Sequence, residues 1–240
     1  AGGTDLLVNV RAGLVTPKTV IDIKKIPGLQ GLEYNEKTGL EIGAAVTVNQ
    51  IAEDPRVQKN YSLLVACAES LASYQLRNRA TVVGNIVNAS PCADMAPALL
   101  CYEAQVVITS KQGSRTVPIR DFFTGVKKTV LVPGEIVEKI LVPATYAGAT
   151  GSYEKLKRIK GHDLGIVDVA MLKKDGMIRM AVSSAAPTPI IVKDCKASDS
   201  GEVLAKAALE AIKPIDDVRS SREYREFMVQ VYVKRLLERV

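Results

Sequence analysis

The sequence has little of what nucleic-acid binding or membrane insertion requires. Its 240 residues include no Trp, and aromatic residues make up only 5% of the chain, so a stacking platform for bases is not expected. The net charge of +6 comes from 32 basic and 26 acidic residues, which are scattered rather than gathered into a basic arm. No run of about eighteen apolar residues occurs. We therefore expect no nucleic-acid partner and no membrane span.

The four cysteines, Cys67, Cys92, Cys101 and Cys195, form no Cys-x-x-Cys pair and show no metal-ligand spacing. We expect no metal and no iron–sulfur cluster in this chain, and we interpret the thiols as small buried hydrophobic groups. A signal-peptide pattern is also absent, which favours a reduced, cytoplasmic protein. Because the chain begins with Ala-Gly-Gly-Thr rather than Met, we expect that an N-terminal piece is missing.

The two standard phosphate-binding fingerprints, G-x-G-x-x-G and G-x-x-x-x-G-K-[ST], are absent. Two other glycine-containing segments could hold an anion, because backbone N–H groups at glycine can approach a phosphate closely. The first runs from Ala1 to Leu6, and the second runs from Ala80 to Pro91, shortly before Asp94. Taken singly, each segment is more often an ordinary turn.

Polar residues that cap helices mark several helix starts. Thr47 lies three residues before a Gln, which is a capping-box signature for a short helix. Ser62 is interpreted as the N-cap of a longer helix whose inward stripe includes Leu71. Ser200 and Ser221 are predicted to open two helices near the C-terminus.

Turn residues separate the predicted strands. Asp175-Gly176 is a strong hairpin signal between two apolar runs, and a second hairpin is predicted around Lys111–Gly113. The β-branched run Ala80–Val87 is interrupted by Gly84-Asn85, and we predict a strand that meets a tight backbone turn there. Ala144–Ser152, rich in Gly and Ala, is predicted as a linker. The expected domains are therefore residues 1–146 and 150–240.

Several motifs recur in an order that is typical of one family. They are A-G-G-T-D-L, A-T-V-V-G-N-I-V-N-A-S-P-C-A-D-M-A-P, V-P-I-R-D-F-F-T-G, L-V-P-G-E-I-V and Y-E-K-L-K-R. Together they resemble the FAD-binding, medium subunit of the molybdenum hydroxylases, of the xanthine dehydrogenase and carbon monoxide dehydrogenase type. The resemblance covers essentially the whole chain. It implies an α+β protein: a two-lobed α/β FAD-binding fold like that of vanillyl-alcohol oxidase, with its first lobe N-terminally incomplete, then a smaller domain with an antiparallel sheet and helices.

The resemblance also implies roles in FAD binding, and it implies neither a strictly catalytic residue nor a metal ligand. The two glycine segments would enclose the pyrophosphate, and Asp94 would accept hydrogen bonds from flavin-side hydroxyls. Val137 would offer backbone groups near the isoalloxazine, Leu71 would contact the adenine end, and Lys155 would favour the anionic reduced flavin. The residues assigned to FAD are Ala1, Gly2, Gly3, Thr4, Asp5, Leu6, Leu71, Thr81, Val82, Val83, Gly84, Asn85, Asn88, Asp94, Val137 and Lys155.

Two positions depart from the family pattern. Many relatives have a second glycine where Val83 stands, which bears on how closely that backbone approaches the phosphate. Some bacterial relatives carry an aromatic residue near Asp163, over the flavin ring, and a polar residue there would leave that face more open.

Four of the residues singled out also have simpler interpretations. Without the resemblance, Asp94 would be taken as the N-cap of a following helix. Lys155 could belong to a solvated strand edge, although it shares a face with Tyr153. His162, the only histidine, fits a surface turn better than a catalytic pair, and Cys92 fits a structural role better than a redox role.

The function implied by the resemblance is that of an oxidoreductase subunit. Electrons from a molybdopterin centre in a large subunit would pass through 2Fe–2S clusters in a small subunit to FAD in this chain, and then to NAD or another acceptor. The expected assembly is a dimer of heterotrimers. Two alternatives stay open at this point: a non-catalytic assembly module that kept the fold, and a stand-alone NAD(P)H flavin reductase.

Overall fold

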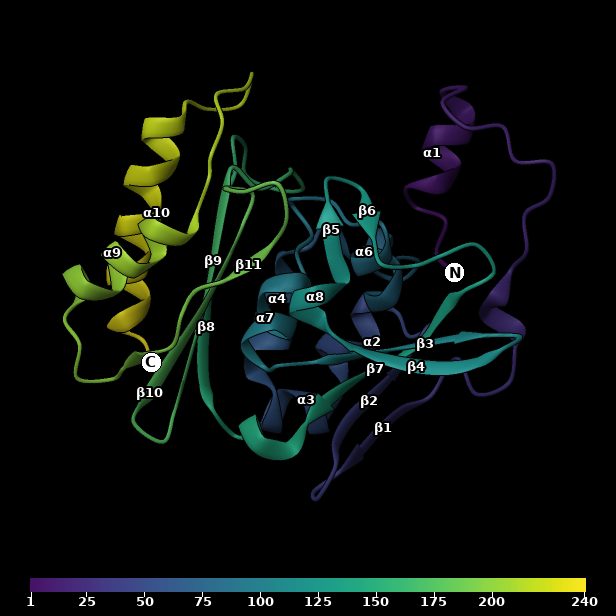
Figure 1. Cartoon of the computed structure of the whole chain (residues 1–240), viewed down its shortest axis with the longest axis horizontal. Helices are drawn as coiled ribbons and strands as arrows, with labels where there is room; N and C mark the ends of the chain where they lie inside the picture. Colours follow the sequence, from purple (N-terminus) through teal and green to yellow (C-terminus); the bar gives the residue numbers. More distant parts are fainter.

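The computed structural model describes all 240 residues, and antiparallel sheets with helices between them form its frame (Figure 1). The first sheet has five strands in the order β1-β2-β7-β3-β4. They are β1 (Leu32–Asn35), β2 (Gly39–Gly43), β7 (Ile136–Pro143), β3 (Gln105–Ser110) and β4 (Gly113–Pro118). The hairpin expected around Lys111–Gly113 is confirmed, since Ser110 pairs with Gly113 across the β3–β4 turn.

Short helices fill the space between the two main sheets. They are α2 (Val48–Glu53), α3 (Pro55–Asn60), α4 (Ser62–Ser70), α5 (Tyr74–Arg77), α6 (Val82–Val87), α7 (Ala96–Cys101) and α8 (Ile119–Phe122). The capping box at the start of α2 is confirmed, because Thr47 and Gln50 exchange hydrogen bonds between side chain and backbone. The longer helix expected from Ser62 is wrong in two respects. Ser62 is its first residue rather than its N-cap, and it ends at Ser70 because the backbone of Leu71 is extended, with a ψ of 116°.

The strand predicted over Ala80–Val87 is a helix, α6. Thr81 is its N-cap, and its hydroxyl oxygen accepts a hydrogen bond from the backbone N–H of Gly84 at 2.9 Å. Val82, Val83 and Ile86 are buried, which is the spacing of one inward helix face. The glycine therefore lies in the first turn of a capped helix and not in a tight turn after a strand.

The second sheet lies in the C-terminal part of the chain, where two longer helices follow it. Its strands are β8 (Thr150–Leu156), β9 (Val167–Lys174), β10 (Met177–Ser183), β11 (Ile190–Ile191) and β12 (Cys195–Lys196), and the helices are α9 (Gly201–Ala211) and α10 (Arg222–Leu237). The Asp175-Gly176 hairpin is confirmed by the β9–β10 register. Ser200 and Ser221 are confirmed as the N-caps of α9 and α10.

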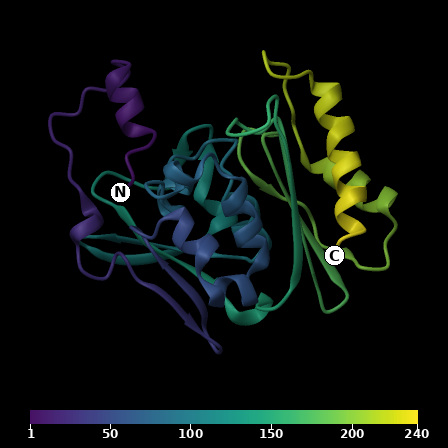
Figure 2. The ribbon, with the colours of Figure 1, turned by 180° about the vertical axis from the view of Figure 1, so that it is seen from behind.

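The second sheet has a hydrophobic core on each of its faces. Ala170, Leu172 and Ala181 belong to a cluster of 42 buried residues that also contains the helices of the middle layer. Val169 and Met180, which point the other way, belong to a cluster of 20 buried residues shared with α9 and α10. Figures 1 and 2 show the resulting order of layers: α9 and α10, the second sheet, the middle helices, and the first sheet. The α+β architecture expected from the resemblance is confirmed.

The remaining elements are short. They are α1 (Leu6–Arg11), the 3₁₀ turns η1 (Ile23–Lys25) and η2 (Ala144–Tyr146), and the two-stranded ribbon of β5 (Phe123–Gly125) and β6 (Lys128–Thr129). The linker expected over Ala144–Ser152 is wrong in part, because η2 and the start of β8 occupy most of it. In no helix do length and apolar character together reach what a bilayer crossing requires.

Candidate functional site

The first glycine segment packs directly against the start of the second. Gly2 lies on the backbone of Arg79 and Ala80, so close that a Cβ atom on Gly2 would be 2.1 Å from the carbonyl oxygen of Arg79. Gly3 has a φ of +73°, a conformation that favours glycine, and its carbonyl accepts a hydrogen bond from the N–H of Leu7. Two segments that are far apart in the sequence therefore share one small region of backbone.

Backbone hydrogen bonds hold the second segment in place before α6 begins. The N–H of Val48 donates to the carbonyl of Ala80 at 2.9 Å, and the N–H of Val82 donates to the carbonyl of Val46 at 3.3 Å. Thr81, 2% exposed, is fixed between these two bonds. The first turn of α6 is thus tied to the segment that precedes α2 and cannot shift independently of it.

The side chains of α6 divide into buried and accessible groups. Val83 is buried in the first core, whereas Gly84 is exposed at the first turn of the helix. The side-chain carbonyl of Asn85 accepts a hydrogen bond from the N–H of Met95 at 3.1 Å, which connects α6 to the residue after Asp94. Asn88 is the half-buried C-cap of α6. The exposed backbone at Gly84 can therefore face a ligand, while the buried residues of α6 hold the helix in place.

Asp94 and Lys155 form a buried ion pair between the two parts of the chain. The Lys155 ammonium lies 2.5 Å from Asp94 Oδ1, and the two side chains are 3% and 12% exposed. The N-cap interpretation of Asp94 is wrong, because Met95 is the N-cap residue of α7 and Asp94 pairs with Lys155 instead. The solvated-edge interpretation of Lys155 is also wrong, since only its backbone lies on an edge strand.

Burial raises the pKa of Asp94, and the positive charge of Lys155 opposes that rise. The pair is therefore a place where charge is held inside the protein at some electrostatic cost. Such pairs are common at sites where a polar ligand completes the hydrogen bonds of buried groups.

Asp168, which pattern reasoning missed, belongs to the same cluster. It lies opposite Lys155 on neighbouring strands and is fully buried, and the pKa of its carboxyl group is raised to about 7 by burial and by the negative charge of Asp94. Its Oδ1 atom and the hydroxyl of Tyr153 on β8 have no hydrogen-bond partner. A single acidic residue inside the apolar strand β9 was the signal that could have identified it.

The other residues expected to contact FAD lie at different depths. Leu71, at the C-cap of α4, is buried in the first core. Val137 also has its side chain in that core, and it pairs with Ile108 in the first sheet. Thr4 is half-buried, while Ala1, Asp5 and Leu6 are exposed. The side chains of Leu71 and Val137 are thus turned into the first core, whereas the glycine segments keep exposed backbone.

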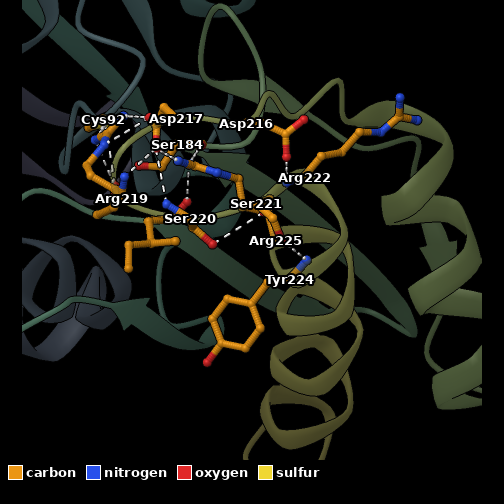
Figure 3. A network of polar contacts seen from close by, with 12 residues as sticks. Cys92, Ser184, Asp216, Asp217, Arg219, Ser220, Ser221, Arg222, Tyr224 and Arg225 are labelled. Atoms are coloured by element: carbon orange, nitrogen blue, oxygen red, sulfur yellow. Dashed lines mark hydrogen bonds and ion pairs between the residues drawn. The ribbon is translucent and has the colours of Figure 1, made fainter.

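Cys92 lies in a polar network at the start of α10. The Arg219 guanidinium lies 3.4 Å from Cys92 Sγ, and it also donates to the carbonyl of Gly165 and to Asp217 (Figure 3). Cys92 has no disulfide partner. His162 is exposed in the β8–β9 loop, which agrees with the surface interpretation.

The donor set fits a ligand that combines phosphates, hydroxyls and a polar ring. A side chain on Gly2 would collide with the Arg79 carbonyl where the two glycine segments meet, and backbone N–H groups of such turns bind phosphate oxygens. The Lys155–Asp94 pair supplies one buried cation and one buried carboxylate for polar groups of the ligand. These are the functional groups that FAD presents, so the residues present fit this cofactor.

Comparison with known proteins agrees with this fit. Residues 1–145 match the family described as the FAD binding domain in molybdopterin dehydrogenase. The chain is 32% identical to the carbon monoxide dehydrogenase medium chain of Hydrogenophaga pseudoflava, over 99% of this chain and 86% of that protein. It is 31% identical to the xanthine dehydrogenase FAD-binding subunit of Escherichia coli O157:H7, again over 99% and 86%.

Solved structures show the same likeness. The carbon monoxide dehydrogenase of Hydrogenophaga pseudoflava, in a form lacking the Mo-pyranopterin moiety, contains a chain that matches with a TM-score of 0.90 at 33% identity, covering 100% of this chain and 87% of that one. Reconstituted CO dehydrogenase from Oligotropha carboxidovorans matches with a TM-score of 0.89 at 27% identity and the same coverage. The chain therefore belongs to the family of FAD-binding, medium subunits of molybdenum hydroxylases, and it is a flavoprotein subunit of an oxidoreductase.

Proposed function

We propose that this chain passes electrons between the 2Fe–2S clusters of a small subunit and NAD or another acceptor, in a complex whose large subunit carries molybdopterin. Bound FAD supplies the chemistry, because it accepts two electrons and releases them to a second partner. The observation that carries the proposal is the meeting of Gly2 with Arg79 and Ala80, which joins two glycine segments in one cradle. Relatives named as medium chains of dehydrogenases support the role of one subunit among several.

The residues of this chain would bind and orient the cofactor, and none of them would exchange a proton with a substrate. We propose that Lys155 holds positive charge beside the flavin and that Asp94 accepts hydrogen bonds from its hydroxyls, since both are buried and adjacent. The pyrophosphate would lie against the glycine cradle. The residues proposed to contact FAD are Ala1, Gly2, Gly3, Thr4, Asp5, Leu6, Leu71, Thr81, Val82, Val83, Gly84, Asn85, Asn88, Asp94, Val137 and Lys155.

The proposal extends to the organisation of the chain and of the complex. We propose domains at residues 1–146 and 150–240, and the second core supports this division because all of its residues lie in the C-terminal part. We propose a dimer of heterotrimers in the cytoplasm as the working assembly. The substrate pocket would lie in the large subunit, so this chain does not determine the compound that is oxidised.

Replacement of Gly2 tests the site. Gly2→Ala places a Cβ atom against the Arg79 carbonyl, so the cradle must open and FAD affinity is expected to fall at least about tenfold, the equivalent of 1.4 kcal/mol. Gly31→Ala is the matched control, because its Cβ would have only ordinary contacts at 3.6 Å or more. Fluorescence titration with FAD measures both. Equal affinities for the two variants would remove the first glycine segment from the site.

Purification of the intact complex tests the electron path. We expect a yellow protein with bound molybdenum and iron, whose flavin absorbance bleaches when reduced nicotinamide cofactor is added without oxygen. A colourless chain that still assembles with its partners would identify an assembly module. Bleaching in a chain that purifies alone, with no large or small subunit, would identify a stand-alone reductase.

A further inference from the structure

A second carboxyl group lies beside the Lys155–Asp94 pair, and the FAD-binding roles assigned above do not use it. Asp168 faces Lys155 across β8 and β9, and it faces Ser183 across β9 and β10. Its neighbours along β9, Val167 and Val169, point into the core beneath α9 and α10. Because side chains alternate along a strand, Asp168 points towards the first domain and the ion pair.

The Asp168 carboxyl group is held on one side and left without a partner on the other. Its Oδ2 accepts hydrogen bonds from the hydroxyls of Ser183 and Ser184, at 2.8 and 2.6 Å, while its Oδ1 has no partner. Gly165 lies so close that a Cβ atom there would be 2.2 Å from Oδ1. Ionisation of a carboxyl group in so enclosed a place is costly. The two serine hydroxyls offset part of that cost, but they do not supply a full counter-charge.

Ser184 connects this carboxyl group to the segment that carries Asp94. It has a φ of +65°, a strained conformation for a residue other than glycine. Its N–H donates to the carbonyl of Pro91 at 2.8 Å, and its carbonyl accepts from Arg225 at 2.7 Å (Figure 3). Together with the bond from its hydroxyl to Asp168, these contacts hold Ser184 through its N–H, its carbonyl and its side chain. The surrounding structure therefore enforces its strained conformation.

Ionisable groups approach Asp168 from β8, α4, α10 and the segment before α7. They are Lys155 and Tyr153 on β8, Asp94 before α7, Cys67 on α4, and Tyr232 and Arg225 on α10. Arg225 is committed to the carbonyls of Ile166 and Ser184 and to Asp217. Lys155 is therefore the cation that acts on Asp168, and Asp94 already shares it.

We propose that Asp168 is a positioning residue of the flavin site that takes up a proton when the polar flavin ring binds beside Lys155. This role rests on the proposed placement of FAD beside Lys155. Hydrogen-bond acceptors of that ring compete for the lysine, and the ring excludes water. Both effects make an ionised Asp168 less favourable, so the carboxylate becomes a carboxylic acid. The proton comes from solvent, and no bond other than O–H forms. FAD affinity must then be higher at low pH, where Asp168 is already protonated.

Calorimetric titration of the flavin-free full chain with FAD tests this role. Measurements at pH 7 in two buffers of different ionisation enthalpy give the number of protons taken up. We expect up to about half a proton per FAD, because burial raises the pKa of Asp168 to about 7 and a group at its pKa is half ionised. FAD affinity is expected to weaken about three- to tenfold between pH 6 and pH 8.

Asp168→Asn is expected to lose most of the proton uptake and of the pH dependence. Asp175→Asn is the matched control: it removes the same charge at the exposed tip of the same hairpin, where a φ of +49° accepts Asn, and it should keep the wild-type behaviour. Ser183→Ala keeps the carboxyl group but removes a hydroxyl donor, so the midpoint of the pH dependence should move to higher pH. The Ser183→Ala variant still tests the role of Asp168 if Asp168→Asn does not fold.

The outcomes separate this role from the proposed site. Equal proton uptake by wild type and Asp168→Asn, or an unchanged midpoint in Ser183→Ala, overturns the role of Asp168 and leaves the FAD site intact. No FAD binding at any pH overturns the proposed site and this role with it. Proton uptake that disappears only with Asp168→Asn supports both.

Discussion

Individual buried charges distinguish this protein from one whose core is purely apolar. Lys155, Asp94 and Asp168 lie between the two hydrophobic cores, and Arg225 lies 1% exposed behind them. Burial of such groups weakens folding unless partners or ligands compensate for the lost hydration. Their retention at one place is consistent with a site whose full set of partners includes a cofactor.

Asp168 gives a prediction for stability that needs no cofactor. Burial raises the pKa of Asp168 from the ordinary value of 3.8 to about 7 in the folded protein. The contribution of Asp168 to the unfolding free energy is therefore complete below about pH 4 and is lost as pH rises through 7. Relative to wild type, Asp168→Asn should gain unfolding free energy between pH 4 and pH 8, by up to about 3 to 4 kcal/mol. Urea unfolding of both proteins at several pH values measures this difference. A difference that does not vary with pH would contradict it.

At the scale of residues, pattern reasoning was strongest where a motif could be matched. The resemblance singled out Asp94 and Lys155, and the structure brings them together. The burial of Lys155 could not be predicted from the sequence, because a lysine in a charged segment is usually solvated. Asp168 could not be assigned a role from the sequence for another reason: it stands alone in an apolar strand, and its partners, Lys155 and Ser183, lie on other strands.

Among the elements, α6 shows how a cap can override β-branched residues. Val82, Val83, Ile86 and Val87 suggested a strand, but helix and strand cannot be separated by composition over so short a run. The Thr81 hydroxyl decides for the helix by accepting the Gly84 N–H. The two C-terminal helices and the Asp175-Gly176 hairpin were predicted correctly because their local signals agree with the final packing.

Thr81 can be tested as the residue that defines α6. Thr81→Ala removes the cap and should lower the unfolding free energy by about 1 to 2 kcal/mol. It should also weaken FAD binding, because α6 would lose its fixed start beside Ala80. Thr81→Ser keeps the hydroxyl and should retain most of the stability. Chemical unfolding and FAD titration of the two variants measure these effects, and a Ser variant as unstable as the Ala variant would argue for lost packing instead.

The whole molecule depends on a polar clamp between α10 and the loops around the proposed site. Arg225 donates to the carbonyls of Ile166 and Ser184, and it pairs with Asp217 at 2.7 Å. Burial opposes ionisation of Asp217, but hydrogen bonds from Arg219 and the charges of Arg225 and Arg219 hold its pKa well below the usual range. This clamp joins the C-terminal helix to the segment that carries Cys92 (Figure 3).

Removal of the buried arginine should destabilise the entire chain. Arg225→Met leaves two buried carbonyls without their side-chain donor and removes one of the two arginines paired with Asp217, and the expected loss is about 2 to 5 kcal/mol. Arg222→Met is the matched control on the same helix, where an exposed pair with Glu226 contributes at most about 0.5 kcal/mol. Thermal and urea unfolding compare them. Similar losses for both variants would show that the clamp is dispensable.

The two-faced second sheet has a consequence for how the protein can be divided. One face of the sheet packs in each core, and Ala170, Leu172 and Ala181 lie on the face towards the FAD-binding part. A fragment that begins after residue 149 would keep this sheet but expose the face that carries these three residues. An exposed apolar sheet surface promotes self-association. Chimeras that exchange the C-terminal part between relatives should therefore fold only when the residues of α4 and α7 that contact this sheet are exchanged with it.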